Sequence, residues 1–160
     1  MCVGAGGALK IRQKVYFAAS SRERHPDQMS GIIGLEPDRT IWRGSRSREP
    51  PRPVTNRWII DSHGDGTVDE RIEELLGAIE PVESGLRRLK AESDAVIDIQ
   101  VVRYFDDPDG TEDDHRVVEL PGMTVERLEG QHQLLSFHLD SALLQRLAAL
   151  SCSVDFDEYA

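Results

Sequence analysis

One amphipathic stretch most constrains what this chain can fold into. It covers residues 64–92, and its apolar residues recur at alternating steps of about three and four, which predicts a helix with one apolar stripe. Thr67, followed three residues later by Glu70, has the pattern of a capping box, so we expect the helix to begin there. Pro81 removes a backbone donor and predicts a kink or split near the middle. The stripe must be buried against another apolar surface.

Residues 95–105 provide a candidate for that surface. Ala95, Ile97, Ile99 and Val101 alternate with Val96, Asp98, Gln100 and Val102. This alternation predicts a strand with a distinct inner face. Shorter runs of similar composition predict further strands at 11–20, 39–44, 57–62, 133–139 and 153–159.

Two shorter helices are also predicted. Pro26 suits the first position of a helix at 26–33, because its missing N–H would be unpaired there in any case. Gly34 then acts as a left-handed cap. Leucines at helical spacing predict the second helix at 141–150.

The predicted order is β-α-β-β-α-β, then a hairpin around Pro121 and Gly122, then β-α-β. We expect an α+β fold: a single two-layer domain with a mainly antiparallel sheet and helices on one face. Residues 1–11 are assigned to an N-terminal tail, and residues 12–160 to the domain.

Charge is unevenly distributed along the chain. Residues 1–60 hold 11 Lys+Arg and 5 Asp+Glu, a net of +6, whereas residues 61–160 have a net charge of −16. The basic part includes an Arg/Pro loop at 43–56, which is too rich in proline to predict regular structure, and the acidic part includes a loop at 106–115. Three alternatives are open: the two parts complement each other within one domain, the Arg/Pro loop folds onto the acidic loop, or the two parts bind charged partners.

Composition excludes several classes of function. A net charge of −10 argues against nucleic-acid binding, and no apolar run approaches the roughly 18 residues of a membrane span. Cys2 and Cys152 are too few for a disulfide framework, so we expect reduced thiols. The N-terminus has too short an apolar core for a signal peptide, and a cytoplasmic location is expected.

No catalytic or metal-binding pattern is complete. The runs "DSHGDGT" and "DDPDGTED" fail the spacing of a calcium loop, and the five histidines show no HxxxH spacing. Cys152 with His138 is the one nucleophilic pair considered, but Cys152 follows an apolar helix end, where an inert thiol is usual. We therefore expect no catalytic residues, no metal and no cofactor.

The tryptophan–arginine region is the remaining candidate site. Six arginines lie between residues 39 and 57, opposed only by Glu49. Arginine provides a rigid fork for carboxylates and phosphates and stacks on aromatic rings. Candidate binding residues are therefore Arg39, Trp42, Arg43, Arg57 and Trp58. The alternative is that the tryptophans are packed in the core and the arginines solubilise a loop.

Four features of the chain resemble a small bacterial family known as domain of unknown function 4279. They are a short helix leading into "GLEPDRTIWRG", the strand start "RWII", the long helix before an alternating strand, and the end "LLSFHLDSALLQRLAALSCSVDFDEY". The resemblance would cover about residues 12–159. It implies an intracellular bacterial α+β protein and provides neither a reaction nor catalytic residues.

Three functional hypotheses follow. The first is a non-enzymatic interaction module, for example an immunity-like protein whose acidic surface docks a basic partner. The second is a small-molecule or anion-binding protein or enzyme with a pocket near Trp42, Trp58 and the arginines. The third is a structural homo-oligomer.

Overall fold

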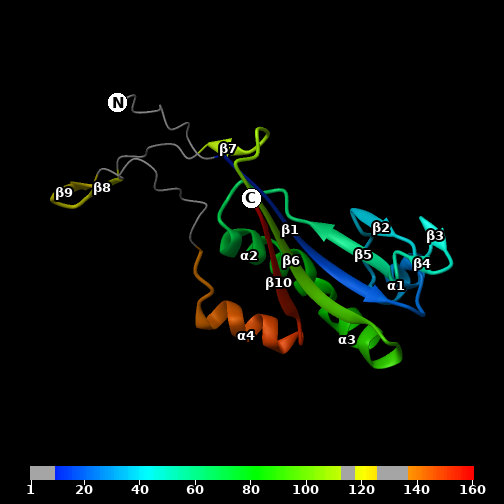
Figure 1. Cartoon of the computed structure of the whole chain (residues 1–160). Helices are drawn as coiled ribbons and strands as arrows, with labels where there is room; N and C mark the ends of the chain where they lie inside the picture. Colours follow the sequence, from blue (N-terminus) through cyan, green and yellow to red (C-terminus); the bar gives the residue numbers. More distant parts are fainter. Residues whose placement is uncertain (1–9, 113–117, 126–136) are drawn as a thin grey trace.

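The computed structural model describes residues 10–112, 118–125 and 137–160 (Figure 1). The elements in chain order are β1 (Lys10–Ser21), α1 (Pro26–Ile33), β2 (Arg39–Ile41), β3 (Ser47–Arg48), β4 (Pro51–Arg52), β5 (Asn56–Asp61), α2 (Val68–Ile79), the 3-10 helix η1 (Glu80–Val82), α3 (Glu83–Glu92), β6 (Val96–Phe105), β7 (Thr111–Glu112), β8 (Val118–Leu120), β9 (Met123–Val125), α4 (Ser141–Ala149) and β10 (Ser153–Tyr159).

The main sheet has the strand order β10-β6-β1-β5-β2. β1 is antiparallel to both β5 and β6, and β2 is antiparallel to β5, whereas β10 runs parallel to β6 at the edge. β7 adds a short pairing at the start of β1. The sheet is thus mainly antiparallel, and the predicted α+β fold is confirmed.

The helices pack on one face of this sheet and form the core with it (Figure 1). Alternate residues of the strands point toward the helices: Val15, Phe17 and Ala19 of β1, Trp58 and Ile60 of β5, and Ile97, Ile99 and Val101 of β6. They meet the apolar stripes of all four α-helices. Burying each large apolar side chain stabilises the fold by about 1.5–3 kcal/mol. The face of the sheet that these residues do not occupy is called the far face below.

The long amphipathic stretch forms two helices, as Pro81 predicts. α2 ends at Ile79, the 3-10 turn η1 contains Pro81, and α3 resumes at Glu83. The capping box is present: the Thr67 N–H donates to Glu70 Oε2 over 2.9 Å. The prediction of α1 is also confirmed, with Gly34 in the left-handed region at φ 84°.

Helices α1 and α3 approach each other closely at one glycine. A Cβ added to Gly85 would lie 2.3 Å from the carbonyl oxygen of Ile33, which no side chain tolerates. Gly85 is therefore required by packing, and it sets how closely α1 lies against α3.

Two local predictions were wrong. The Arg/Pro loop contains regular structure, because β3 and β4 form a two-stranded hairpin within it. The strand predicted at 133–139 is not formed in its described part, since residues 137–139 have no regular structure; residues 133–136 lie outside the described residues. The predicted hairpin around Gly122 is confirmed by the pairing of β8 with β9.

The Arg/Pro loop and the acidic loop lie toward opposite ends of the sheet (Figure 1). Ile11 of β1 pairs with Phe105, just before the acidic loop, whereas Ser21 at the other end of β1 pairs with Asn56, just after the Arg/Pro loop. The ten residue steps between Ile11 and Ser21 span about 30 Å. The Arg/Pro loop therefore does not fold onto the described part of the acidic loop. Within the described residues, no helix is long and apolar enough to cross a membrane.

Candidate functional site

Two of the predicted site residues, Arg39 and Arg57, lie on the far face of the sheet. Arg39 of β2 pairs with Ile59 of β5, and Arg57 of β5 pairs with Ser20 of β1. Because directly paired residues project from the same face, both arginines point away from the helices. They cover the far face over Ile59, which is fully buried although it is outside the main core cluster.

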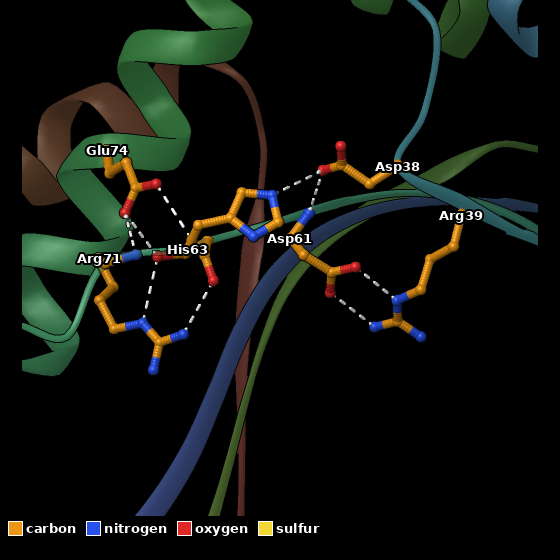
Figure 2. A network of polar contacts seen from close by, with 8 residues as sticks. Asp38, Arg39, Asp61, His63, Arg71 and Glu74 are labelled. Atoms are coloured by element: carbon orange, nitrogen blue, oxygen red, sulfur yellow. Dashed lines mark hydrogen bonds and ion pairs between the residues drawn. The ribbon is translucent and has the colours of Figure 1, made fainter.

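Arg39 is fully engaged within the protein. Its Nε lies 2.6 Å from Asp61 Oδ2, and its Nη2 lies 2.8 Å from Asp61 Oδ1 (Figure 2). This is the bidentate geometry in which arginine binds carboxylates most strongly. The guanidinium also lies over the Tyr16 ring, 4.8 Å from its centroid. Arg39 therefore has little capacity left for an external anion.

Arg57 is engaged in the same way but more deeply. Its Nη2 lies 3.1 Å from Asp98 Oδ2, its Nε donates to Ser20 Oγ, and its guanidinium lies 5.6 Å from the Tyr16 centroid. Burial raises the pKa of the Asp98 carboxyl, and the charge of Arg57 acts in the opposite direction. Arg57 thus compensates a buried carboxylate at the middle of the sheet.

The far face also contains a shallow hollow of about 540 Å³. Its lining includes Lys14, Tyr16, Arg39 and Asp61. Since Arg39 and Asp61 neutralise each other, Lys14 is the main uncompensated charge of the hollow. This face is better explained as a layer of internal ion pairs than as a ligand site.

A polar network at the end of β5 holds the chain where it enters α2 (Figure 2). The Glu74 carboxylate accepts from Ser62 Oγ at 2.7 Å, from the His63 N–H at 3.1 Å and from the Gly64 N–H at 3.2 Å. The hydrogen bond from Ser62 lowers the pKa of Glu74. Glu74 therefore fixes the turn after β5.

Arg71, one turn before Glu74 on α2, completes this network. It is buried, and its guanidinium donates to Ser62 Oγ, to the Ser62 carbonyl at 2.9 Å and to the Gln13 carbonyl at 2.8 Å. Burial lowers the pKa of Arg71. These contacts tie α2 to both β5 and β1.

The network contains a serine, a histidine and carboxylates, but its geometry is not that of a nucleophilic triad. Ser62 is buried and its hydroxyl is bonded to Glu74 and Arg71, so its oxygen is not available to attack a substrate. His63 points to Asp38 instead, with 3.7 Å between Nε2 and Oδ2 (Figure 2). We interpret the network as structural.

The third arginine of the predicted set, Arg43, lies in a different place. Together with Arg22, His25 and Arg48 it lines a hollow of about 640 Å³ beside the β3–β4 hairpin, and we call these four residues the arginine corner. The remaining lining residues are Gly44, Ser45, Pro51 and Asn56. Among the residues that the structure describes, none is acidic at this lining, and none forms an ion pair with the three arginines.

The backbone around the arginine corner is held by hydrogen bonds. The Ser45 N–H donates to the Trp42 carbonyl in a tight turn in which Gly44 takes a φ of 72°, and the Gly44 N–H donates to the Pro53 carbonyl. The buried Asn56 side chain accepts from the Arg43 N–H at 2.8 Å. The corner is therefore preorganised, which lowers the entropy that a ligand must overcome.

Strand pairing within the hairpin decides which of its arginines belongs to the corner. Arg48 pairs with Pro51, and both line the hollow, whereas Arg52 pairs with Ser47, and neither does. Neighbouring positions of a strand project to opposite faces. Arg48 and Arg52 are thus two exposed arginines on one hairpin, of which only the first faces the hollow.

The two predicted tryptophans have different environments. Trp58 is fully buried, packs edge-on against Phe17 and donates from Nε1 to Ser30 Oγ at 3.2 Å. Trp42 is 40% exposed and stacks on the His25 ring with 5.4 Å between centroids, so the expectation that it is packed in the core was wrong. Trp42 lines a second hollow of about 610 Å³, adjacent to the arginine corner.

The five predicted site residues therefore do not form one site. Arg39 lies on the far face, Trp58 lies in the core, Arg43 belongs to the arginine corner, and Trp42 lines the second hollow, which Arg57 reaches from the far face. Arg22 and His25 line the corner but were not among the residues predicted from the sequence. The register of β1 with β5 places them: Ser21 pairs with Asn56, so the residues that follow β1 lie beside those that precede β5. A correct prediction of that pairing would have indicated Arg22 and His25 as neighbours of Arg43.

Cys152 is not suited to nucleophilic chemistry. Burial raises the pKa of its thiol to about 12, so the thiolate is scarce at neutral pH. Its Sγ lies 3.4 Å from the Ser153 carbonyl oxygen. Within the described part of the chain, no group of three or more His, Cys, Asp or Glu residues could hold a metal ion.

Comparison with protein families identifies the class to which this domain belongs. Residues 10–130 match the model of the family described as Domain of unknown function (DUF4279), and the chain belongs to that family. The match includes the arginine corner and most of the sheet but ends before α4 and β10. Comparisons with curated proteins and with solved structures gave no match.

Proposed function

We propose that this chain is a non-catalytic binding protein whose site is the arginine corner and whose ligand carries a phosphate or a comparable multiply charged anion. One observation carries the proposal: Arg22, Arg43 and Arg48 line one hollow with no acidic side chain among its described lining residues. Three like charges repel one another, and a bound dianion would relieve that repulsion. A single carboxylate would compensate only part of the charge.

The chemistry of the lining suits an oxyanion. Guanidinium groups present forked N–H donors that match phosphate oxygens, and charge-assisted hydrogen bonds are roughly twice as strong as neutral ones. His25 adds a donor at the same lining. Since Arg22, Arg43 and Arg48 make no ion pair with any described residue, binding would not have to break an internal contact.

Calorimetric titration with inorganic phosphate at low ionic strength tests the proposal. Each arginine that binds the anion contributes about 1.5–3 kcal/mol, so Arg48→Ala should weaken phosphate binding by on the order of tenfold. Arg52→Ala is the matched control, because it removes the same charge from the same hairpin outside the hollow. Equal losses in both variants, or no binding by the unmodified protein, would refute a site at the corner.

The acidic docking surface predicted from the charge distribution is a second candidate function. The observation that favours it is the edge strand β10, where Asp155 and Asp157 are exposed on the far face. A basic partner attracted to this edge should be captured at low salt and released at high salt. Asp155→Asn with Asp157→Asn should abolish the capture, and a partner retained by this double variant would contradict docking at β10.

A further inference from the structure

We infer that the ligand of the arginine corner is a mononucleotide, with its phosphate among the arginines and its base on Trp42. This inference rests on the proposed function and adds the part of the ligand that is not charged. It begins from the position of Trp42, a large aromatic side chain that remains 40% exposed. The core already contains Trp58, so nothing in the packing of the fold requires a second tryptophan beside the arginines.

Trp42 lies between two hollows, the arginine corner and a second hollow that includes Arg46 and Arg57. One face of its ring stacks on His25, which lines the arginine corner. Trp42 itself lines the second hollow together with the apolar side chains of Ile41 and Val54, of which Val54 is 60% exposed. Ser45 belongs to the lining of both hollows, so they adjoin at this residue.

The second hollow has the composition of a site for a planar heterocycle. Trp42 provides a stacking surface in its lining, and Thr40, Ser45 and Thr55 bring hydroxyl groups that can bond to ring nitrogens and carbonyls. The lining also includes Arg46 and Arg57, and guanidinium groups can themselves stack on planar rings. The two hollows, of about 640 and 610 Å³, each fall in the size range of small-ligand sites. A ligand that joins a phosphate to a flat ring matches the arginines of the corner and the exposed ring of Trp42.

The net charge of the protein favours a mononucleotide over a nucleic-acid chain. A chain would bring one negative charge with each nucleotide to a protein of net charge −10. The positive charge lies in two adjoining hollows at one end of the sheet, with three arginines in the first and Arg46 and Arg57 in the second, where Arg57 is already paired with Asp98. A surface of this extent suits a mononucleotide better than a chain.

Titrations with adenosine 5′-monophosphate, adenosine and inorganic phosphate test the inference. Binding is measured by calorimetry and by the fluorescence emission of Trp42. We expect the nucleotide to bind at least tenfold more tightly than phosphate and to quench Trp42, because stacking on an aromatic side chain contributes on the order of tenfold or more. Trp42→Ala should reduce the affinity for the nucleotide to that for phosphate and leave the affinity for phosphate unchanged. Trp42→Phe should retain most of the affinity for the nucleotide, because phenylalanine keeps an aromatic ring. Tyr159→Ala, at an exposed aromatic residue of β10, is the control and should have no effect.

The outcomes separate this inference from the proposed function. Phosphate binding that depends on Arg48, without any gain for the nucleotide, would overturn the inference and leave the function standing. Adenosine binding as tightly as the nucleotide would overturn it as well, since the phosphate would then contribute nothing. Tighter binding of a 5′-phosphorylated oligonucleotide would replace the mononucleotide by a nucleic-acid end. Failure of adenosine 5′-monophosphate, adenosine and inorganic phosphate to bind would refute both the inference and the proposed function.

Discussion

The arginines of the far face and two of the three arginines of the arginine corner, Arg43 and Arg48, come from one stretch of sequence, yet they have opposite electrostatic roles. Arg39 and Arg57 each bind an aspartate and lie over Tyr16, so their charge is used within the fold. Arg43 and Arg48 make no such pair among the described residues and line an open hollow. The difference shows that local charge density does not identify a binding site. Only arginines without an internal partner remain available to a ligand.

The two aspartates that pair with the far-face arginines come from the acidic part of the chain, residues 61–160. The charge asymmetry is therefore partly resolved inside the domain, as the interpretation of complementary halves expects. The charge asymmetry is not compensated at the arginine corner, because no acidic residue is among the described lining residues of its hollow.

The loss of stability on removing an arginine should follow its internal partners, and it should be largest at Arg71. Arg71→Met removes three hydrogen bonds from a buried guanidinium and leaves buried acceptors at Ser62 and Gln13 without donors. We expect the free energy of unfolding to fall by about 3 kcal/mol, measured by urea denaturation. Arg87→Met, at an exposed pair with Glu83 on one helix, should change it by less than about 0.5 kcal/mol. Similar losses in both variants would contradict the structural role of the network.

Arg57→Ala should give the next largest loss of stability, about 2 kcal/mol at neutral pH, because it leaves the buried Asp98 carboxylate without its cation. Asp98→Asn in the same background should recover part of that loss, which urea denaturation of the four proteins of the cycle would show.

The loss at Arg57 should also depend on pH. The folded pKa of Asp98 is raised above its unfolded value of about 3.8, so the ionised carboxyl opposes folding and stability falls as pH rises through the folded pKa. Without Arg57 the folded pKa rises further. The stability difference between wild type and variant should therefore be smallest in acid, where Asp98 is protonated, and should grow toward neutral pH. A difference that is constant with pH would exclude Asp98 as the relevant partner.

Arg39→Ala should have a smaller effect, about 0.5–1 kcal/mol. Its ion pair with Asp61 is bidentate, but both side chains are partly exposed, and solvent screens such pairs. Thermal unfolding at low and high salt would measure this, and the difference between wild type and variant should shrink as salt rises. A loss as large as that of Arg57→Ala would mean that stacking on Tyr16 contributes more than the ion pair.

Arg48→Ala should have the smallest effect on stability, within about 0.5 kcal/mol. Because the substitution removes one of several like charges, it should be neutral or slightly stabilising at low salt. The same variant should have the largest effect on phosphate binding. Urea denaturation and calorimetric titration of one preparation would show that Arg48→Ala weakens phosphate binding without lowering stability. A destabilisation near that of Arg57→Ala would place Arg48 among the structural arginines and remove it from the site.

Much of the fold could be predicted from local patterns. The boundaries of α1, the split at Pro81 and the inner face of β6 follow from cap residues, a missing donor and strict alternation, all of which act within a few residues. The hairpin β3–β4 could not, because its proline-rich sequence is unfavourable for strands and its pairing depends on the surrounding turns.

The candidate site was predicted in part. The sequence alone determined that arginine and tryptophan are concentrated between residues 39 and 58, and that Gly34 and Pro37 end the preceding helix and turn the chain. Tertiary structure alone decided which of these side chains are available. Strand pairing placed Arg39 and Arg57 beside aspartates that are distant in sequence, buried Trp58 and brought Arg22 and His25 to Arg43. The physical reason is that an arginine's role depends on whether a carboxylate lies within a few ångströms, and that distance is set by strand register and not by neighbours along the chain.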